Sequence, residues 1–80
     1  MENTYEYWVY TDGMKEYCIE FDSVRDAEKA YDIAEIWNDD YRGIYEPWIG
    51  DQELYIVCRN DTLHRFLETI EKEIGITERL

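Results

Sequence analysis

The sequence predicts an α+β fold of the order ββαββα, in which an antiparallel four-stranded sheet carries two helices packed on one face. Two stretches, residues 4–21 and 44–59, are rich in β-branched and aromatic residues and are each interrupted by a glycine-containing turn, which is typical of β-hairpins. Two other stretches, 23–38 and 62–74, place apolar residues at helical spacing. With 80 residues, the chain is expected to form a single domain over residues 1–80.

The register of the first hairpin depends on the turn at Asp12-Gly13. A two-residue loop would place Glu6 opposite Ile19, on the face that should be buried. We expect a three-residue loop instead, with Gly13 left-handed, because an unpaired buried Glu6 would cost several kcal/mol. One face of the hairpin then carries Tyr5, Tyr7, Val9, Tyr17, Ile19 and Phe21, and the other carries Glu6, Trp8, Tyr10, Glu16, Cys18 and Glu20.

The helix over 23–38 separates apolar from acidic residues. Ser23 precedes it as the natural N-cap, since a serine hydroxyl accepts a hydrogen bond from the first turn. The expected packing face consists of Val24, Ala27, Ala30, Tyr31, Ile33, Ala34 and Trp37. Beside it fall four acids, Glu28, Asp32, Glu35 and Asp39, with Asp40 at the end of the helix.

The second half of the chain repeats this organisation without repeating the residues. Pro47 cannot donate to a β-ladder, so its strand belongs at an edge or contains a bulge. The apolar run Leu54 to Cys58 is typical of an interior strand. Asp61 or Thr62 is expected to cap the helix over 62–74, whose stripe contains Leu63, Phe66, Leu67, Ile70 and Ile74. The last residues, from Thr77 to Leu80, are expected to fray.

The net charge of −12, from 20 acidic and 8 basic residues, restricts the choice of partner. Nucleic acid, anionic membrane and acidic substrates are disfavoured because they would be repelled at physiological salt. A basic protein surface is favoured. The alternative is an acidic surface that is only solvated and aids solubility.

No set of residues indicates catalysis, a metal site or a cofactor. The chain has one serine and one histidine, and Ser23 is already expected to cap a helix rather than to pair with His64. Cys58 lies in an expected interior strand, where burial makes a thiol inert. Cys18 and Cys58 lack metal-ligand spacing, and no signal core or membrane-spanning run is present. We expect a cytoplasmic protein that is not an enzyme.

The acidic helix and the acidic, aromatic face of the first hairpin are the candidate partner-binding residues. Large exposed aromatic side chains indicate a binding surface more strongly than exposed acids do. The candidates are Glu28, Asp32, Glu35, Asp39 and Asp40 on the helix, with Glu6, Trp8, Tyr10, Glu16 and Glu20 on the hairpin.

In size, negative charge, aromatic content and lack of a catalytic set, the chain resembles small phage-encoded inhibitors of bacterial defence, the anti-CRISPR proteins and DNA-mimicking anti-restriction proteins. The resemblance covers the whole chain in character and no segment by motif. It implies acids spaced like phosphates that occupy a Lys/Arg groove of a nucleic-acid-binding protein in the host cytoplasm. The alternative is an acidic interaction or regulatory module, a monomer or a homodimer through its aromatic sheet face.

Overall fold

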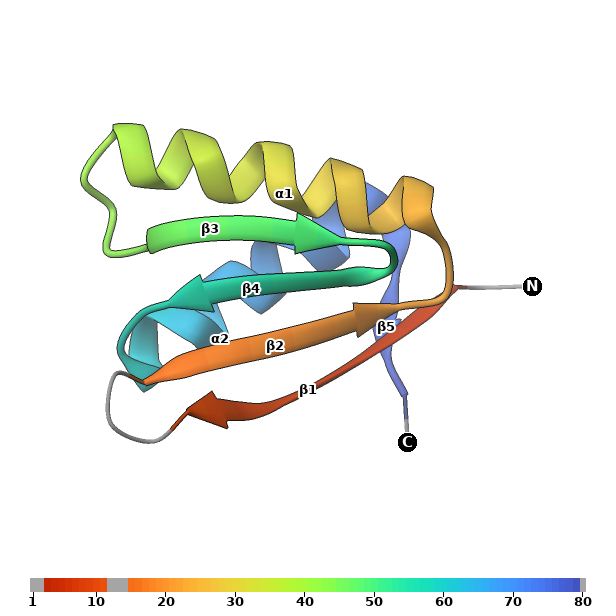
Figure 1. Cartoon of the computed structure of the whole chain (residues 1–80). Helices are drawn as coiled ribbons and strands as arrows, with labels where there is room; N and C mark the ends of the chain where they lie inside the picture. The colour runs from red at the N-terminus through yellow and green to blue at the C-terminus, as the bar shows by residue number, and fades with distance from the viewer. Residues whose placement is uncertain (1–2, 12–14, 80) are drawn as a thin grey trace.

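The computed structural model describes residues 3–11 and 15–79, which form an α+β fold with two helices and a five-stranded sheet (Figure 1). The strand order across the sheet is β3-β4-β2-β1-β5. In chain order the elements are β1 (Thr4–Thr11), β2 (Glu16–Phe21), α1 (Val24–Asp39), β3 (Tyr45–Gly50), β4 (Glu53–Val57), α2 (Asn60–Ile70), the π-helix η1 (Glu71–Gly75) and β5 (Thr77–Glu78).

Strand β5 shows that the predicted four-stranded antiparallel sheet, and with it the simple ββαββα order, was wrong. β5 pairs in parallel with β1, so one side of the sheet is not antiparallel. Thr77 N donates to Asn3 O at 3.2 Å and Arg79 N donates to Tyr5 O at 2.6 Å. A strand of two residues has no period that a sequence pattern can reveal. Of the segment expected to fray, Thr77 to Arg79 form an edge of the sheet, and Leu80 lies outside the described residues.

The register of the first hairpin is the one predicted from the cost of burying Glu6. Tyr5 lies opposite Phe21, and Val9 lies opposite Tyr17. Beyond Val9 the register shifts, so that Thr11 lies opposite Glu16. The turn at Asp12-Gly13 lies outside the described residues.

Helix α1 begins as predicted, because the Ser23 hydroxyl accepts a hydrogen bond from Asp26 N at 3.2 Å. Asp26 itself is buried, and its Oδ2 accepts a bond from Asn3 Nδ2 at 2.8 Å. Val24 does not join the packing face, since it is exposed at the first turn. The residues of α1 that are fully buried in the core are Ala27, Ala30, Ala34 and Trp37.

Helix α2 begins earlier than predicted, at Asn60, and its N-cap residue is Arg59 rather than Asp61 or Thr62. Thr62 is buried against Gly43, where an added Cβ would lie 3.1 Å from the Thr62 hydroxyl, so its side chain packs instead of capping. After α2 the chain continues through η1 to Gly75, whose φ of +79° reverses the chain. The buried Ile76 then contacts the core, as a glycine-terminated helix predicts.

One core lies between the sheet and both helices. Its side chains come from the inner face of the sheet and from the facing sides of α1 and α2, so the two helices cover the same face. Strand β4 is interior, and β3 is an edge strand with an irregular register between Tyr45 and Trp48, around Pro47. Both observations agree with the sequence. The opposite face of the sheet, here called the outer face, is covered by neither helix.

Candidate partner-binding surfaces

The solvent side of α1 carries a row of exposed acids. Glu28, Asp32, Glu35 and Asp39 are all exposed, and Asp40 is the exposed C-cap residue. Because they follow one another at intervals of four, three and four residues, the four helical acids extend over about 16 Å of the helix at 1.5 Å per residue. Within the described residues, every ion pair involves Arg59 or Arg79, so these carboxylates have no cationic partner within 4.0 Å.

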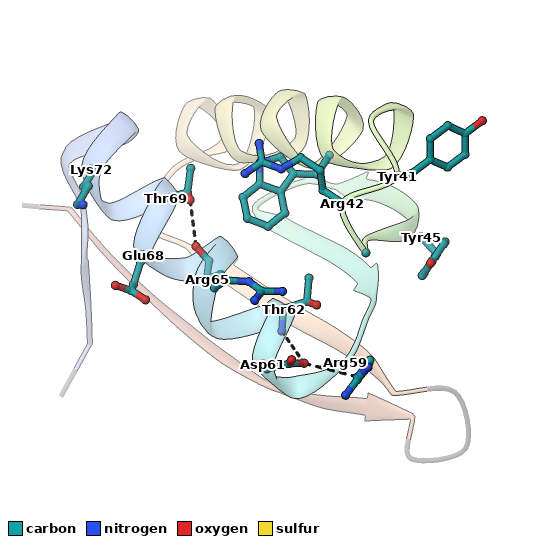
Figure 2. Close-up of a pocket in the computed structure, with 12 residues that line it drawn as sticks. Tyr41, Arg42, Tyr45, Arg59, Asp61, Thr62, Arg65, Glu68, Thr69 and Lys72 are labelled. Atoms are coloured by element: carbon teal, nitrogen blue, oxygen red, sulfur yellow. Dashed lines mark hydrogen bonds and ion pairs between the residues drawn. The ribbon is translucent and has the colours of Figure 1, made fainter.

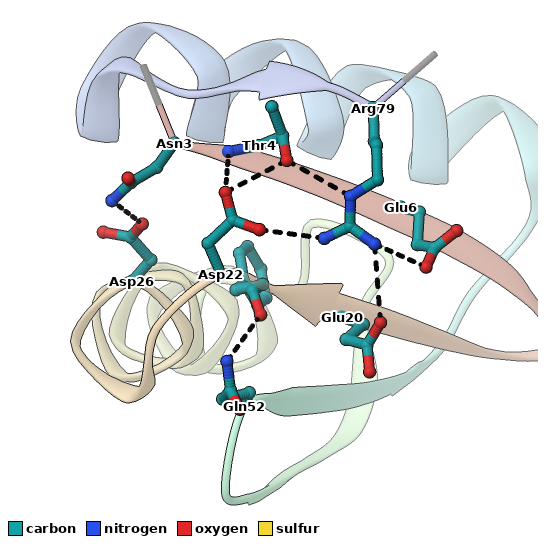
Figure 3. A network of polar contacts seen from close by, with 9 residues as sticks. Asn3, Thr4, Glu6, Glu20, Asp22, Asp26, Gln52 and Arg79 are labelled. Carbon is teal, nitrogen blue, oxygen red and sulfur yellow. Dashed lines mark hydrogen bonds and ion pairs between the residues drawn. The ribbon is translucent and has the colours of Figure 1, made fainter. Parts of the chain in front are cut away.

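The acids on the outer face of the sheet are in a different electrostatic situation, because Arg79 lies among them (Figure 3). Its Nη1 is 2.6 Å from Glu6 Oε1 and 3.6 Å from Glu20 Oε1. Glu6 and Glu20 are therefore partly neutralised within the molecule. Glu16 is half-buried and lies opposite Thr11 near the other end of the hairpin.

Arg79 also reaches Asp22, with Nη2 at 2.9 Å from Oδ1. The other oxygen of Asp22 accepts hydrogen bonds from the Thr4 backbone N–H at 2.6 Å and from the Thr4 hydroxyl at 3.0 Å. These bonds, the backbone one most of all, and the guanidinium of Arg79 hold the pKa of the Asp22 carboxyl below its usual value. Asp22 is thus a structural carboxylate that holds β1 and β5 against the start of α1.

An aromatic row crosses four strands on the outer face. Trp8 lies opposite Cys18, Cys18 opposite Tyr55, and Tyr55 opposite Trp48. Trp48 stacks on Tyr55 with ring centroids 4.1 Å apart and planes within 7°, and Tyr10 meets Tyr55 edge-on at 4.9 Å. Trp8, Tyr10 and Trp48 are 39%, 53% and 48% exposed. This row provides a rigid, partly apolar surface.

Trp48 was not among the predicted binding residues. The irregularity around Pro47 breaks the strict alternation of β3, so the sequence does not tell which face Trp48 occupies. The predicted outer-face residue Cys18 is fully buried under the aromatic row. Burial raises the pKa of the Cys18 thiol to about 11, which makes it unreactive at neutral pH.

The predicted residues form two surfaces rather than one. Helix α1 packs on the inner side of the sheet, whereas Trp8 stands on the outer side, in the register of Cys18 and away from the core. Strand β1 is also separated from β3, the strand that runs beside α1, by β2 and β4 (Figure 1). A single flat partner cannot cover the α1 acids and the aromatic row together.

The residues considered for chemistry have structural surroundings. Ser23 caps α1, and His64 meets the ring of Tyr7 edge-on at 6.3 Å between centroids. Burial raises the pKa of the Cys58 thiol to about 12. Among the residues that the structure describes, no three His, Cys, Asp or Glu side chains are placed to hold a metal ion. No helix in the described part of the chain has the length and apolar character to span a membrane.

A third surface was not foreseen from the sequence. It is a groove of about 790 Å³ beside the C-terminal end of α1 and along α2, and four of its lining residues are cations, Arg42, Arg59, Arg65 and Lys72 (Figure 2). These residues are spread over 31 positions of an acidic chain and form no basic run. Arg59, Arg65 and Lys72 lie on or beside the continuous segment of α2 and η1, and the packing of α1 beside α2 brings Arg42 to them.

No known protein family, curated protein or solved structure matches the chain.

Proposed function

We propose that the protein is a small acidic inhibitor that occupies the positively charged nucleic-acid-binding site of a host defence effector, of the anti-CRISPR or anti-restriction type. The observation that carries the proposal is the row of exposed carboxylates on α1, Glu28, Asp32, Glu35 and Asp39, which form no ion pair within the described residues. Such a row is available to a cationic partner.

The spacing of the row supports a phosphate-like role. Four charges over about 16 Å correspond to one charge per about 5.5 Å, compared with one per about 3.4 Å along each strand of duplex DNA. The helix therefore offers more than half of the linear charge density of a nucleic-acid strand on a rigid rod. Lys and Arg side chains arranged for phosphates can reach such a row and form charge-assisted hydrogen bonds with it.

The net charge of the molecule further restricts the class of partner. A net charge of −12 repels nucleic acid and anionic membranes, so the partner would be the basic surface of the effector itself. An inhibitor of this kind needs no catalytic group or cofactor. It would act in the cytoplasm, and in that of the host if a phage encodes it.

The test is a competition experiment. The immobilised protein is incubated with a bacterial lysate, bound proteins are eluted with duplex DNA, and the eluted protein is identified, purified and titrated at increasing salt. We expect a nucleic-acid-binding protein whose affinity falls steeply between about 50 and 200 mM salt, as expected for several phosphate-like contacts. A complex that is insensitive to salt and that DNA cannot displace would show that the acids are not the binding surface.

The aromatic row supports a second candidate, an interaction module that forms a homodimer through the outer face. Trp8 and Trp48 are exposed at the two ends of the row, and the nearby Glu6 and Glu20 share Arg79, which lowers the repulsion between two copies at this face. Sedimentation over a range of concentrations tests this candidate. A dimer that Trp48→Ala weakens and that Tyr41→Ala, at an exposed aromatic outside the row, leaves intact would support it, whereas a monomer at about 100 µM would reject it.

A further inference from the structure

We propose that the groove lined by Arg42, Arg59, Arg65 and Lys72 binds a phosphorylated small molecule of nucleotide size. This inference concerns a different surface from the α1 acids and does not depend on the inhibitor proposal.

The charge of the groove is opposite to that of the whole protein. Four of the eight basic residues of the chain line it, against two acids, Asp61 and Glu68, so the groove has a local surplus of two positive charges on a protein of net charge −12. Folding an acidic chain does not require its cations to be gathered in one place. Spread over the surface, they would relieve more of the repulsion between carboxylates.

Three of the four cations, Arg42, Arg65 and Lys72, form no ion pair within the described residues. Arg59 is 3.6 Å from Asp61, in a pair whose side chains are 87% and 60% exposed, and the solvated pair adds little stability. Arg42 and Arg65 form no ion pair with any carboxylate in the described part of the chain, although Glu68 lines the same groove. An anionic ligand would therefore not have to displace a carboxylate of the protein from the guanidinium groups of Arg42 and Arg65.

The position of Arg42 is fixed by the core. Its guanidinium lies 4.2 Å from the centroid of the Trp37 ring, in a cation–π contact. Trp37 is buried and meets Phe66 of α2 edge-on at 5.5 Å. One side of the guanidinium is thus held against a rigid support, which lowers the conformational entropy that binding would otherwise cost.

Arg65 approaches the same space from α2. Figure 2 shows its side chain extending toward Thr62, below Arg42. The hydroxyl of Thr69, which also lines the groove, donates to the Arg65 backbone oxygen at 3.0 Å. The groove therefore places guanidinium groups from two different elements, the chain after α1 and α2 itself, on either side of one space.

The size of the groove and its arginines indicate the class of ligand. Guanidinium groups bind phosphate oxygens in a bidentate manner, and three of the four cations are arginines. The volume of about 790 Å³ lies within the range of about 300 to 1,000 Å³ that is usual for small-molecule sites, and exceeds what one phosphate needs. The Arg42 plane, and the exposed aromatic side chain of Tyr45 in the lining, offer stacking surfaces for a base.

Calorimetric titration of the purified protein with ATP, pyrophosphate and adenosine at low salt tests the proposal. We expect saturable binding of ATP, weaker binding of pyrophosphate and little or no binding of adenosine. Arg65→Gln should weaken ATP binding about tenfold or more, because hydrogen bonds to charged groups are worth that factor. Arg65→Lys keeps the charge but loses the bidentate geometry. Its affinity for ATP should therefore lie between that of Arg65→Gln and that of the parent.

Arg25→Gln is the matched control. Arg25 is an exposed cation on α1 that does not line the groove, so this variant changes the net charge of the protein by the same amount as Arg65→Gln. Its affinity for ATP should stay within about twofold of the parent, since exposed charges at a distance are screened. Unfolding of each variant is followed by circular dichroism to verify that the fold is kept.

Three results would overturn the proposal. One is the absence of saturable binding of ATP and pyrophosphate at low salt. Another is an equal loss of affinity in Arg25→Gln and Arg65→Gln, which would indicate general electrostatics instead of a site. Equal affinity for pyrophosphate and ATP would overturn the assignment to a nucleotide. Because none of these titrations involves a protein partner, their outcome is separate from that of the inhibitor test.

Discussion

Arg79 Nη2 donates to Asp22 Oδ1 at 2.9 Å and so joins the end of the chain to the connection between β2 and α1 (Figure 3). Thr4 donates twice to the other oxygen of Asp22. The same arginine also contacts Glu6. One carboxylate thus connects β1, β5 and the start of α1, which explains how a strand of two residues stays on the sheet.

This network predicts a pH dependence. Since the pKa of Asp22 is lowered in the folded protein, its stabilising contribution is present above the unfolded-state pKa of about 3.9 and is lost as the pH falls through the folded-state pKa. Between about pH 5 and pH 2, the free energy of unfolding of the parent should fall relative to that of Asp22→Asn. Urea unfolding at a series of pH values measures this difference.

Asp32→Asn is the control for the pH experiment. The Asp32 carboxylate is exposed and accepts no hydrogen bond from the described residues. Asp32→Asn keeps the Asp22 network, so between about pH 5 and pH 2 its free energy of unfolding should still fall relative to that of Asp22→Asn. Parallel curves for Asp22→Asn and the parent would contradict the structural role of Asp22.

Much of the first hairpin was predictable because a single energetic cost decides its register. Burying Glu6 without a partner is so unfavourable that one of two registers could be rejected, and the pairing of Val9 with Tyr17 confirms the other register. The predicted loop length is not tested, because residues 12–14 lie outside the described residues. The Ser23 cap was predictable because its signal is local. Strand β5 was not, since it depends on contacts between Arg79 and residues such as Glu6, which are 73 positions apart.

The candidate site was predicted less well than the fold. The sequence identifies which residues are acidic or aromatic, but whether an acid is free depends on tertiary contacts, as the pairing of Glu6 and Glu20 with Arg79 shows. The division into an α1 surface and an outer-face surface depends on the layer in which each element packs. The basic groove was missed because Arg42, which follows α1, meets the cations on and beside α2 only in the folded protein, and because these cations form no basic run in the chain.

Trp8→Ala should expose Cys18 without unfolding the protein. Trp8 is 39% exposed and lies opposite Cys18, which is fully buried between its neighbours on the outer face. Removing the indole should open a path to the thiol and increase its rate of modification by a disulfide reagent under native conditions, while cooperative unfolding is retained. Mass spectrometry then identifies which of the two cysteines carries the label, since the other one, Cys58, lies in the core.

Trp48→Ala provides the comparison. Trp48 stacks on Tyr55 and is not a direct strand neighbour of Cys18. Its removal should accelerate the labelling of Cys18 less than the removal of Trp8 does. Loss of cooperative unfolding in Trp8→Ala would show that the indole belongs to the core.

Tyr41→Gly should stabilise the protein. Tyr41 follows α1 with a φ of +57°, a left-handed conformation that is costly for a residue with a Cβ, and its side chain is 92% exposed. Glycine adopts this conformation freely, and after allowance for its larger entropy in the unfolded chain we expect a gain of about 0.5 to 1 kcal/mol. For a domain of this size, 1 kcal/mol corresponds to a rise of about 4 to 8 °C in Tm, which thermal unfolding measures.

Tyr41→Ala separates backbone strain from loss of the ring. Alanine keeps the Cβ and therefore the unfavourable left-handed conformation, so its Tm should remain near that of the parent. If Tyr41→Ala and Tyr41→Gly raise the Tm equally, the destabilisation at this position comes from the tyrosine ring and not from the left-handed backbone.

The last prediction concerns the acids of α1. In the triple variant Asp32→Asn, Glu35→Gln, Asp39→Asn, the fold should be kept, because the three carboxylates are exposed and form no ion pair within the described residues. Loss of repulsion between acids one turn apart should leave the stability unchanged or raise it by a few tenths of a kcal/mol per pair. Binding to a basic nucleic-acid site should instead be lost, because each charge-assisted contact is worth about 1.5 to 3 kcal/mol.

A second triple variant, Asp51→Asn, Glu73→Gln, Glu78→Gln, removes the same number of charges from exposed positions outside α1. If the α1 acids act as phosphate substitutes at a defined surface, this control should inhibit nearly as well as the parent, with only the modest decrease that a smaller net charge causes through long-range attraction. Thermal unfolding and titration with the purified partner are measured on all three proteins. Equal inhibition by the α1 variant and the parent would mean that Asp32, Glu35 and Asp39 form only a solvated face, and would leave the outer face of the sheet as the surface that binds the partner.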